Sequence, residues 1–157
     1  MLINEKDVSL ELLQDLFKSI NVSSSIVEVY PAAPEMKLDR DAYLEVSYPN
    51  QLPFIIWIDT QAKVQLRFRV IIAKDKEREK FKNNDLQCWA AGSNQQLDYF
   101  GALSTDGFHI TLEHRLPYQD GIASSTVISV ARCIAEGAMA AQQTLAVMSL
   151  RLVAHAH

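Results

Sequence analysis

The sequence predicts an α+β fold in which an antiparallel sheet carries its helices mainly on one face. Strand and helix patterns are segregated in blocks, in the order α-β-β-β-β-α-β-β-α, rather than alternating as they do around a parallel sheet. Several strand patterns alternate apolar and polar residues, which is typical of a sheet with one buried face. The length of 157 residues and the 48% hydrophobic content suit one core, so we expect residues 1–157 to form a single α+β domain.

The first block contains one helix and two strands. Residues 9–20 predict an amphipathic helix with Ser9 as its N-cap, because their apolar side chains recur at intervals of three and four. A strand rich in β-branched residues follows at 25–30 and is ended by prolines, which cannot donate to a strand ladder. After a loop at 31–40, the alternating residues 43–48 predict the second strand.

The central block predicts two strands, residues 54–59 and 64–73, joined as a hairpin by a three-residue loop. A loop of that length places Ile56 opposite Leu66 and leaves one face of the hairpin apolar. The next predicted elements are a short helix, two further strands and a long amphipathic helix, over residues 85–97, 99–103, 108–116 and 124–151 respectively. The apolar spacing along the long helix places Leu145 and Leu152 on the same buried face.

Alternation within these strands assigns side chains to two faces. We expect the face covered by the first and last helices to carry Phe54, Ile56, Ile58, Leu66, Phe68, Val70, Phe108, Ile110 and Leu112. The helix-free face is expected to carry Ile55, Trp57, Arg67, Arg69, Phe100 and His109. Tryptophan and arginine are enriched at binding hot spots, so these six residues are the candidate site for a protein or peptide partner. The alternative is an ordinary solvated face, in which the arginines pair with Glu45 or Glu113.

Charge and cysteine usage exclude several functional classes. A net charge of −4 and a pI near 5.5 argue against nucleic acid as a partner, because phosphate binding needs a basic face. Neither a signal peptide nor an apolar stretch of membrane-spanning length is visible, so we expect a cytoplasmic protein with no membrane association. Cys88 and Cys133 stand alone in apolar patterns and are expected to be free thiols.

Motifs for catalysis and for ligand capture are missing. The chain has only 5 glycines, and no glycine-rich phosphate loop or nucleophile elbow occurs. His109 and Glu113 are four residues apart on one strand, about 13 Å, which is too far to chelate one metal ion. We therefore expect no catalytic residues, no metal and no cofactor.

The second half of the sequence carries Asn94, Phe100-Gly101, the turn Ser104-Thr105-Asp106-Gly107, a strand that ends at Leu116-Pro117, and Asp120-Gly121. In these residues it resembles the YbjN-type bacterial sensory transduction regulator family, whose fold is similar to that of the type III secretion chaperones. The resemblance implies a non-enzymatic regulator or chaperone-like protein-binding module with a broad link to stress and motility regulation. It transfers no site residue, because the family has no established catalytic residues.

Resemblance to the dimeric secretion chaperones also implies a homodimer, for which the helix at 85–97 is the candidate contact. The chain departs from the chaperone pattern by an extra strand at 25–48 and by a milder acidic charge. Two other classes stay open: an enzyme of an unrecognised kind and a structural subunit of a larger assembly. A deep pocket with convergent titratable groups would favour the enzyme, and a large apolar patch without a groove would favour the subunit.

Overall fold

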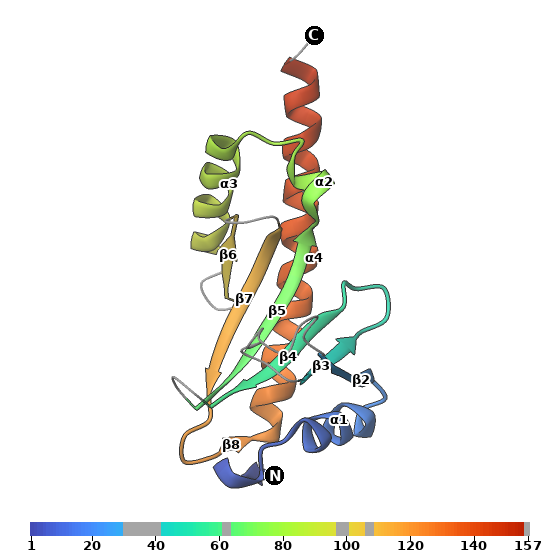
Figure 1. Cartoon of the computed structure of the whole chain (residues 1–157). Coiled ribbons are helices and arrows are strands. Elements are labelled where there is room, and N and C mark those ends of the chain that lie inside the picture. Colours follow the sequence, from blue (N-terminus) through green and yellow to red (C-terminus); the bar gives the residue numbers. More distant parts are fainter. Residues whose placement is uncertain (30–41, 61–63, 97–100, 106–108, 156–157) are drawn as a thin grey trace.

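Figure 1 presents the computed structural model, which describes residues 1–29, 42–60, 64–96, 101–105 and 109–155. The elements are β1 (Leu2–Ile3), η1 (Glu5–Asp7), α1 (Leu10–Ser19), β2 (Ser23–Glu28), β3 (Ala42–Ser47), β4 (Phe54–Asp59), β5 (Gln65–Ala73), α2 (Asp75–Arg78), α3 (Asn83–Gln96), β6 (Ala102–Ser104), β7 (Ile110–Pro117), β8 (Ile122–Ala123) and α4 (Ser124–His155). The longer elements follow the predicted order. The short elements β1, η1, α2 and β8 were not predicted, because two to four residues carry too little periodicity to read.

The main sheet has six antiparallel strands in the order β2-β3-β4-β5-β7-β6. A second, two-stranded sheet joins β1 to β8, so the first strand lies beside the start of α4. The predicted α+β class with an antiparallel sheet is confirmed.

The register of the central hairpin differs from the prediction by two residues. Ile56 lies opposite Phe68 rather than Leu66, because pairing stops at Asp59 and Gln65 and the connection is longer than three residues. A shift of two keeps every side chain on its face, since strand side chains alternate with a period of two. The predicted buried face is therefore correct for its described members, and Phe108 lies outside the described residues.

Helices α1 and α4 pack against this face and share one core with it. Ser9 caps α1 as predicted: its hydroxyl accepts a hydrogen bond from the backbone N–H of Leu12 at 3.2 Å. Phe17 of α1 meets Phe54 of β4 edge to face, with ring centroids 6.5 Å apart. The core lies between these two helices and the sheet.

Helix α4 is longer than the core that it covers. Figure 1 shows it running behind the sheet and projecting beyond it at the C-terminal end, with α3 to one side. Leu145 is 6% exposed, whereas Leu152, which was expected on the same buried face, is 36% exposed. The prediction for Leu152 was wrong because helical periodicity does not reveal where the sheet beneath a helix ends.

Candidate functional site

The helix-free face brings together four of the six predicted site residues. Trp57 of β4 is the Cα partner of Arg67 in β5, and Ile55 is the partner of Arg69. In the next strand, Glu113 of β7 is the Cα partner of Arg69. The predicted cluster of arginine, tryptophan and isoleucine therefore exists on adjacent strands.

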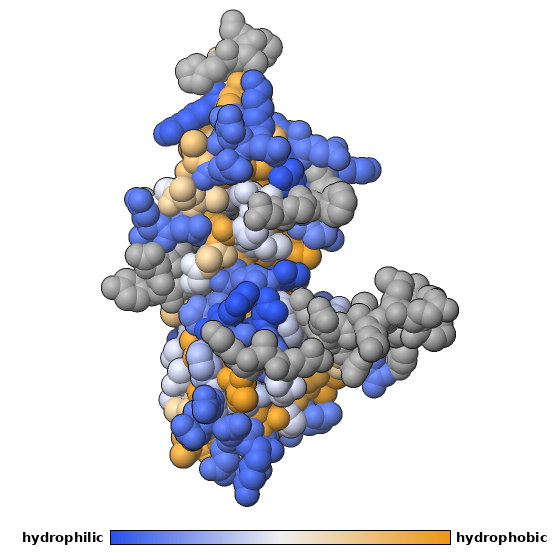
Figure 2. All heavy atoms as spheres, turned by 60° about the vertical axis from the view of Figure 1, so that its left-hand side comes forward, coloured by the Kyte–Doolittle hydropathy of each residue, from blue (hydrophilic) through white to orange (hydrophobic). Residues whose placement is uncertain are grey.

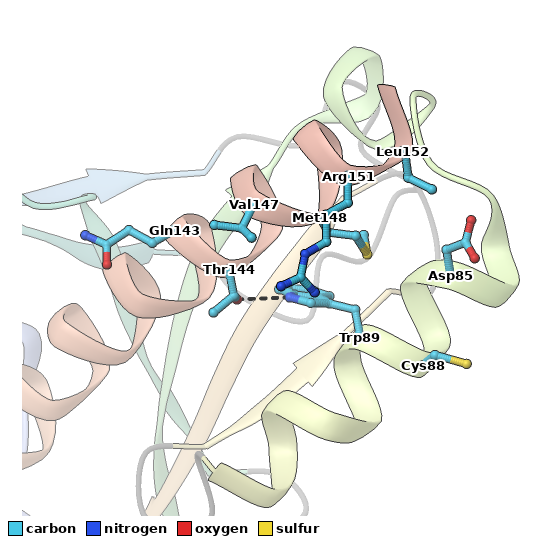
Figure 3. Close-up of a pocket in the computed structure, with 9 residues that line it drawn as sticks. All are labelled: Asp85, Cys88, Trp89, Gln143, Thr144, Val147, Met148, Arg151 and Leu152. Carbon is cyan, nitrogen blue, oxygen red and sulfur yellow. Dashed lines mark hydrogen bonds between the residues drawn. The ribbon is translucent and has the colours of Figure 1, made fainter. Parts of the chain in front are cut away.

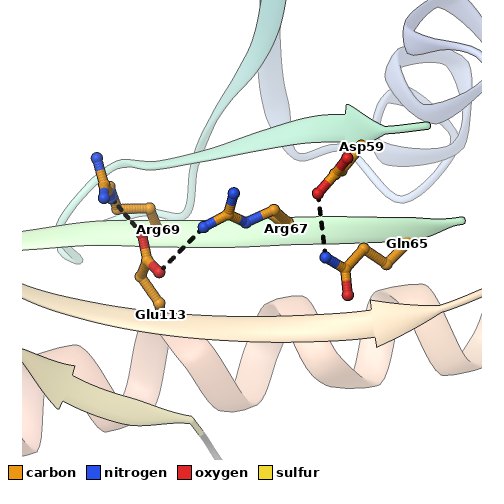
Figure 4. A network of polar contacts seen from close by, with 5 residues as sticks. All are labelled: Asp59, Gln65, Arg67, Arg69 and Glu113. Atoms are coloured by element: carbon orange, nitrogen blue, oxygen red, sulfur yellow. Dashed lines mark hydrogen bonds and ion pairs between the residues drawn. The ribbon is translucent and has the colours of Figure 1, made fainter. Parts of the chain in front are cut away.

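One carboxylate serves both arginines. Arg69 donates from Nε to Glu113 Oε1 at 2.6 Å, and an Arg67 terminal nitrogen lies 3.5 Å from Glu113 Oε2 (Figure 4). Beside them, Gln65 donates to Asp59 at 3.1 Å. The pairing with Glu113, one of the two expected partners, means that the arginines already bind a group within the chain.

Trp57 is not exposed, contrary to the expectation for a hot-spot residue on a free surface. Its exposed fraction is 3%, and the guanidinium carbons of Arg67 and Arg69 lie 4.7 Å and 5.6 Å from its ring centroid. These distances fit cation–π contacts. The ring is therefore part of the protein interior on this side, and a partner on this face would meet the arginines rather than the indole.

The contacts described above do not include the other two predicted residues. Phe100 lies outside the described residues. His109 is half-buried and immediately precedes β7, beyond a β-bulge where the register shifts between Ile71 and Ala73. The extra residue of this bulge, Ile72, lies in β5 rather than in β7. The assignment of His109 to the helix-free face stays a prediction.

A groove that the sequence did not predict separates α3 from the projecting end of α4. Its volume is about 750 Å³, and Figure 3 shows its lining side chains. They are Asp85, Cys88 and Trp89 of α3 and Gln143, Thr144, Val147, Met148, Arg151 and Leu152 of α4. One hydrogen bond crosses it, from Trp89 Nε1 to Thr144 Oγ1 at 3.0 Å.

Large aliphatic side chains meet solvent along this end of α4. The exposed fractions are 48% for Val147, 71% for Leu150 and 57% for Val153. Figure 2, which brings the α3 side forward, shows hydrophobic residues mixed with hydrophilic ones in the upper part of the molecule, where this helix end lies. Exposed apolar surface beside a groove is a candidate interaction site.

A signal for this groove is present in the sequence. Between residues 137 and 154 the sole charged residue is Arg151, and beyond residue 145 aliphatic residues occur on all sides of the helix. An exposed helix end normally carries charges on its outer face. Their scarcity is the feature of the sequence that sets this helix end apart from an ordinary solvated one.

A second hollow near the N-terminus gathers titratable groups. Its volume is about 660 Å³, and Glu5, Tyr118 and Asp120 are among its lining residues. Glu5 Oε2 accepts the backbone N–H of Asp120 at 3.1 Å. Burial, with the nearby Glu5 and Asp59 carboxylates, raises the pKa of Tyr118, so its phenol stays protonated at neutral pH. This set offers no activated nucleophile.

Within the described ranges, no three histidine, cysteine or acidic side chains converge as a metal site. In the same part of the chain, no helix combines the length and apolarity needed to cross a bilayer.

Comparison with known proteins identifies the fold. The crystal structure of YbjN from E. coli, described as a candidate transcription regulator, is similar to this chain with a TM-score of 0.58. The match has 11% sequence identity and covers 90% of this chain and 94% of YbjN. No family model matches the sequence, and no curated protein matches it significantly. The predicted YbjN-type fold is confirmed.

Proposed function

We propose that this chain is a non-enzymatic, regulator-like protein-binding module that acts as a homodimer joined through the groove between α3 and α4. The fold shared with YbjN supports the regulator-like class. The observation that carries the proposal is the groove itself, whose lining includes the exposed aliphatic side chains of Val147 and Leu152. A helix that presents aliphatic side chains to a hydrophobic groove is a recurring mode of protein recognition.

A second copy of the same chain suits the groove because one surface offers both the projecting and the receiving parts. Val147 and Leu152 are the exposed aliphatic residues of α4 in the groove, and Trp89 and Met148 line the same hollow. A two-fold symmetric contact uses the same patch on both copies and therefore needs a patch that complements itself. Under this symmetry, the aliphatic residues of each α4 enter the groove of the other copy.

The charges of the groove are also self-complementary. Asp85 lies on α3 and Arg151 on α4, and within the described residues neither forms an ion pair inside the chain. A two-fold axis between the grooves would pair Asp85 of each copy with Arg151 of the other. Opposite charges that meet across an interface favour the correct partner and register.

Charge reversal tests this contact. Asp85→Arg alone sets arginine against arginine across the interface, and Arg151→Asp alone sets aspartate against aspartate, so each variant should be monomeric near 17.7 kDa by light scattering. Mixing the two variants creates two opposite-charge pairs and should restore a dimer. Restoration on mixing requires an intermolecular contact, because neither variant can recover within its own chain. A mixture that stays monomeric rejects the Asp85–Arg151 pairing.

An aliphatic substitution tests the groove independently. Val147→Glu should abolish the dimer, because Val147 lines the groove and is exposed. Leu2→Glu is the matched control, since Leu2 is also an exposed aliphatic residue, at 65%, and lies at the opposite end of the molecule (Figure 1). A dimeric Val147→Glu protein would reject the groove as the contact. A monomeric wild-type protein would reject the homodimer itself and leave the regulator-like class to be tested by partner binding.

The helix-free face is the second candidate surface, for a protein or peptide partner. Support comes from the exposed Arg115, which is the Cα partner of Arg67, and from Ile71, which is 39% exposed on the same face. Arg115→Glu should remove a bound partner while thermal stability stays unchanged, because this side chain is exposed. A partner that binds this variant with wild-type affinity would exclude this face.

We also propose a single domain over residues 1–157 and a cytoplasmic location. The one continuous core supports the first, and the two free cysteines support the second, because reducing compartments keep isolated thiols unpaired. Fractionation of cells that express the tagged protein would test the location.

A further inference from the structure

Strand β6 forms one edge of the main sheet and has three residues, Ala102–Ser104. Its middle residue, Leu103, is the Cα partner of Leu112 in β7. In an antiparallel pair, residues alternate between those that bond to the partner strand and those whose backbone groups point away from it. Leu103 is of the second kind, since its N–H and C=O are both bound on the outer side, by Asn94.

The side chain of Asn94 occupies the position that a neighbouring strand would take. Its Oδ1 accepts the backbone N–H of Leu103 at 2.6 Å, and its Nδ2 donates to the carbonyl oxygen of Leu103 at 3.3 Å. A bonded residue of an adjacent antiparallel strand supplies the same two bonds from its own C=O and N–H. Only an amide side chain combines an acceptor and a donor in this way.

Helix α3 holds Asn94 at the edge. Leu86 and Ala90 of α3 are buried in the common core, and Trp89 is tied to Thr144 of α4. The contact between α3 and β6 is lateral, and Figure 1 shows the helix beside this strand. Whether the outer backbone groups of β6 are covered by Asn94 therefore depends on the position of α3.

We propose that Asn94 is a strand mimic that closes the β6 edge, and that the edge, once open, accepts β6 of a second copy of this chain. A two-fold axis at Leu103 would let Leu103 of each copy exchange both backbone bonds with Leu103 of the other. That pair replaces the two bonds of Asn94 one for one, which makes a second copy the matching occupant. Unprotected edge strands are known sites of such association.

Amide hydrogen exchange in the Asn94→Ala protein tests the closure. In dilute solution the Leu103 amide should exchange several-fold faster than in the wild-type protein, while the amides of β7 keep their protection. Gln95→Ala is the matched control on the same helix, because Gln95 is exposed and makes no such bond; it should leave the Leu103 amide unchanged. An unchanged Leu103 amide in Asn94→Ala overturns the proposal.

The occupant is tested in a background that lacks the groove contact. The double variant Asn94→Ala, Val147→Glu should associate as its concentration rises, and the Leu103 amide should regain protection in the associated form, whereas Val147→Glu alone should not associate in this way. A double variant that stays monomeric with an exposed Leu103 amide rejects the second copy as occupant. This result is independent of whether the groove dimer exists.

The wild-type protein supplies a test that needs no stable variant. In mild denaturant, the Leu103 amide should open together with the amides of α3, such as those of Leu86 and Ala90, because the helix carries the closing group. Opening together with Leu112 of β7 would contradict the dependence of this edge on α3.

Discussion

The guanidinium carbon of Arg67 lies 4.7 Å from the centroid of the Trp57 ring, directly across the β4–β5 pair. The arginine is itself held by Glu113, 3.5 Å from one of its terminal nitrogens. The ring is 3% exposed although it points away from the helices. This side of the sheet therefore has a structural role of its own.

The first prediction concerns the stability of this cluster. Trp57→Ala should lower the free energy of unfolding by about 3 kcal/mol or more, as tryptophan truncation does in a buried site. Arg67→Ala should cost only about 1 kcal/mol, because its ion pair is partly open to solvent. Urea titration of both variants measures the difference. Equal and small decreases in the free energy of unfolding would mean that the Trp57 ring is exposed to solvent in the folded protein.

For Trp57, the sequence predicts the face of the sheet but not the burial of the side chain. Period-two alternation assigned it correctly to the helix-free side, and the same alternation kept Ile56 on the buried side even though the predicted hairpin register was wrong. Burial of Trp57 could not be predicted, because it depends on arginines that fold over the ring from the next strand. Alternation gives the face of a side chain and not what covers it.

The groove was missed for a related reason. Helical periodicity ranked Leu145 and Leu152 as equivalent, but only Leu145 lies above the sheet, and α4 continues past it. The point at which a helix extends beyond the sheet is set by tertiary packing, which the periodicity of the helix does not reveal. The dearth of charge between residues 137 and 154 was the one local clue.

The second prediction concerns Gly101, one of the residues on which the family resemblance rests. Gly101 has a φ of +120°, and a Cβ there would overlap the backbone oxygen of Glu113. Gly101→Ala should therefore cost about 3 kcal/mol or more. Gly92→Ala is the control: Gly92 lies in α3 with no atom within 4 Å of an added Cβ, and alanine should stabilise the helix by about 1 kcal/mol or less. Thermal unfolding of both proteins separates these outcomes.

The third prediction concerns the two cysteines, both free in the structure. Titration of denatured, unreduced protein should count two thiols. In the native protein Cys88 should react faster than Cys133, because Cys88 is exposed and Cys133 is half-buried. A bulky maleimide on Cys88 should also weaken the proposed dimer, since this residue lines the groove. A dimer unaffected by this label would place the contact elsewhere.

The last prediction concerns acid stability and His114, which lies opposite Phe68 on the core side of the sheet, with ring centroids 6.4 Å apart. Burial lowers the pKa of His114 below its ordinary value of 6.5. As pH falls through 6.5, the unfolded chain takes up a proton before the native protein does, so stability decreases until the native pKa is passed. His114→Gln should thus flatten the pH dependence of unfolding between about pH 7 and pH 5. Urea titrations across this range and an NMR titration of the His114 ring provide the measurement, and a native ring that titrates at or above 6.5 would contradict the prediction.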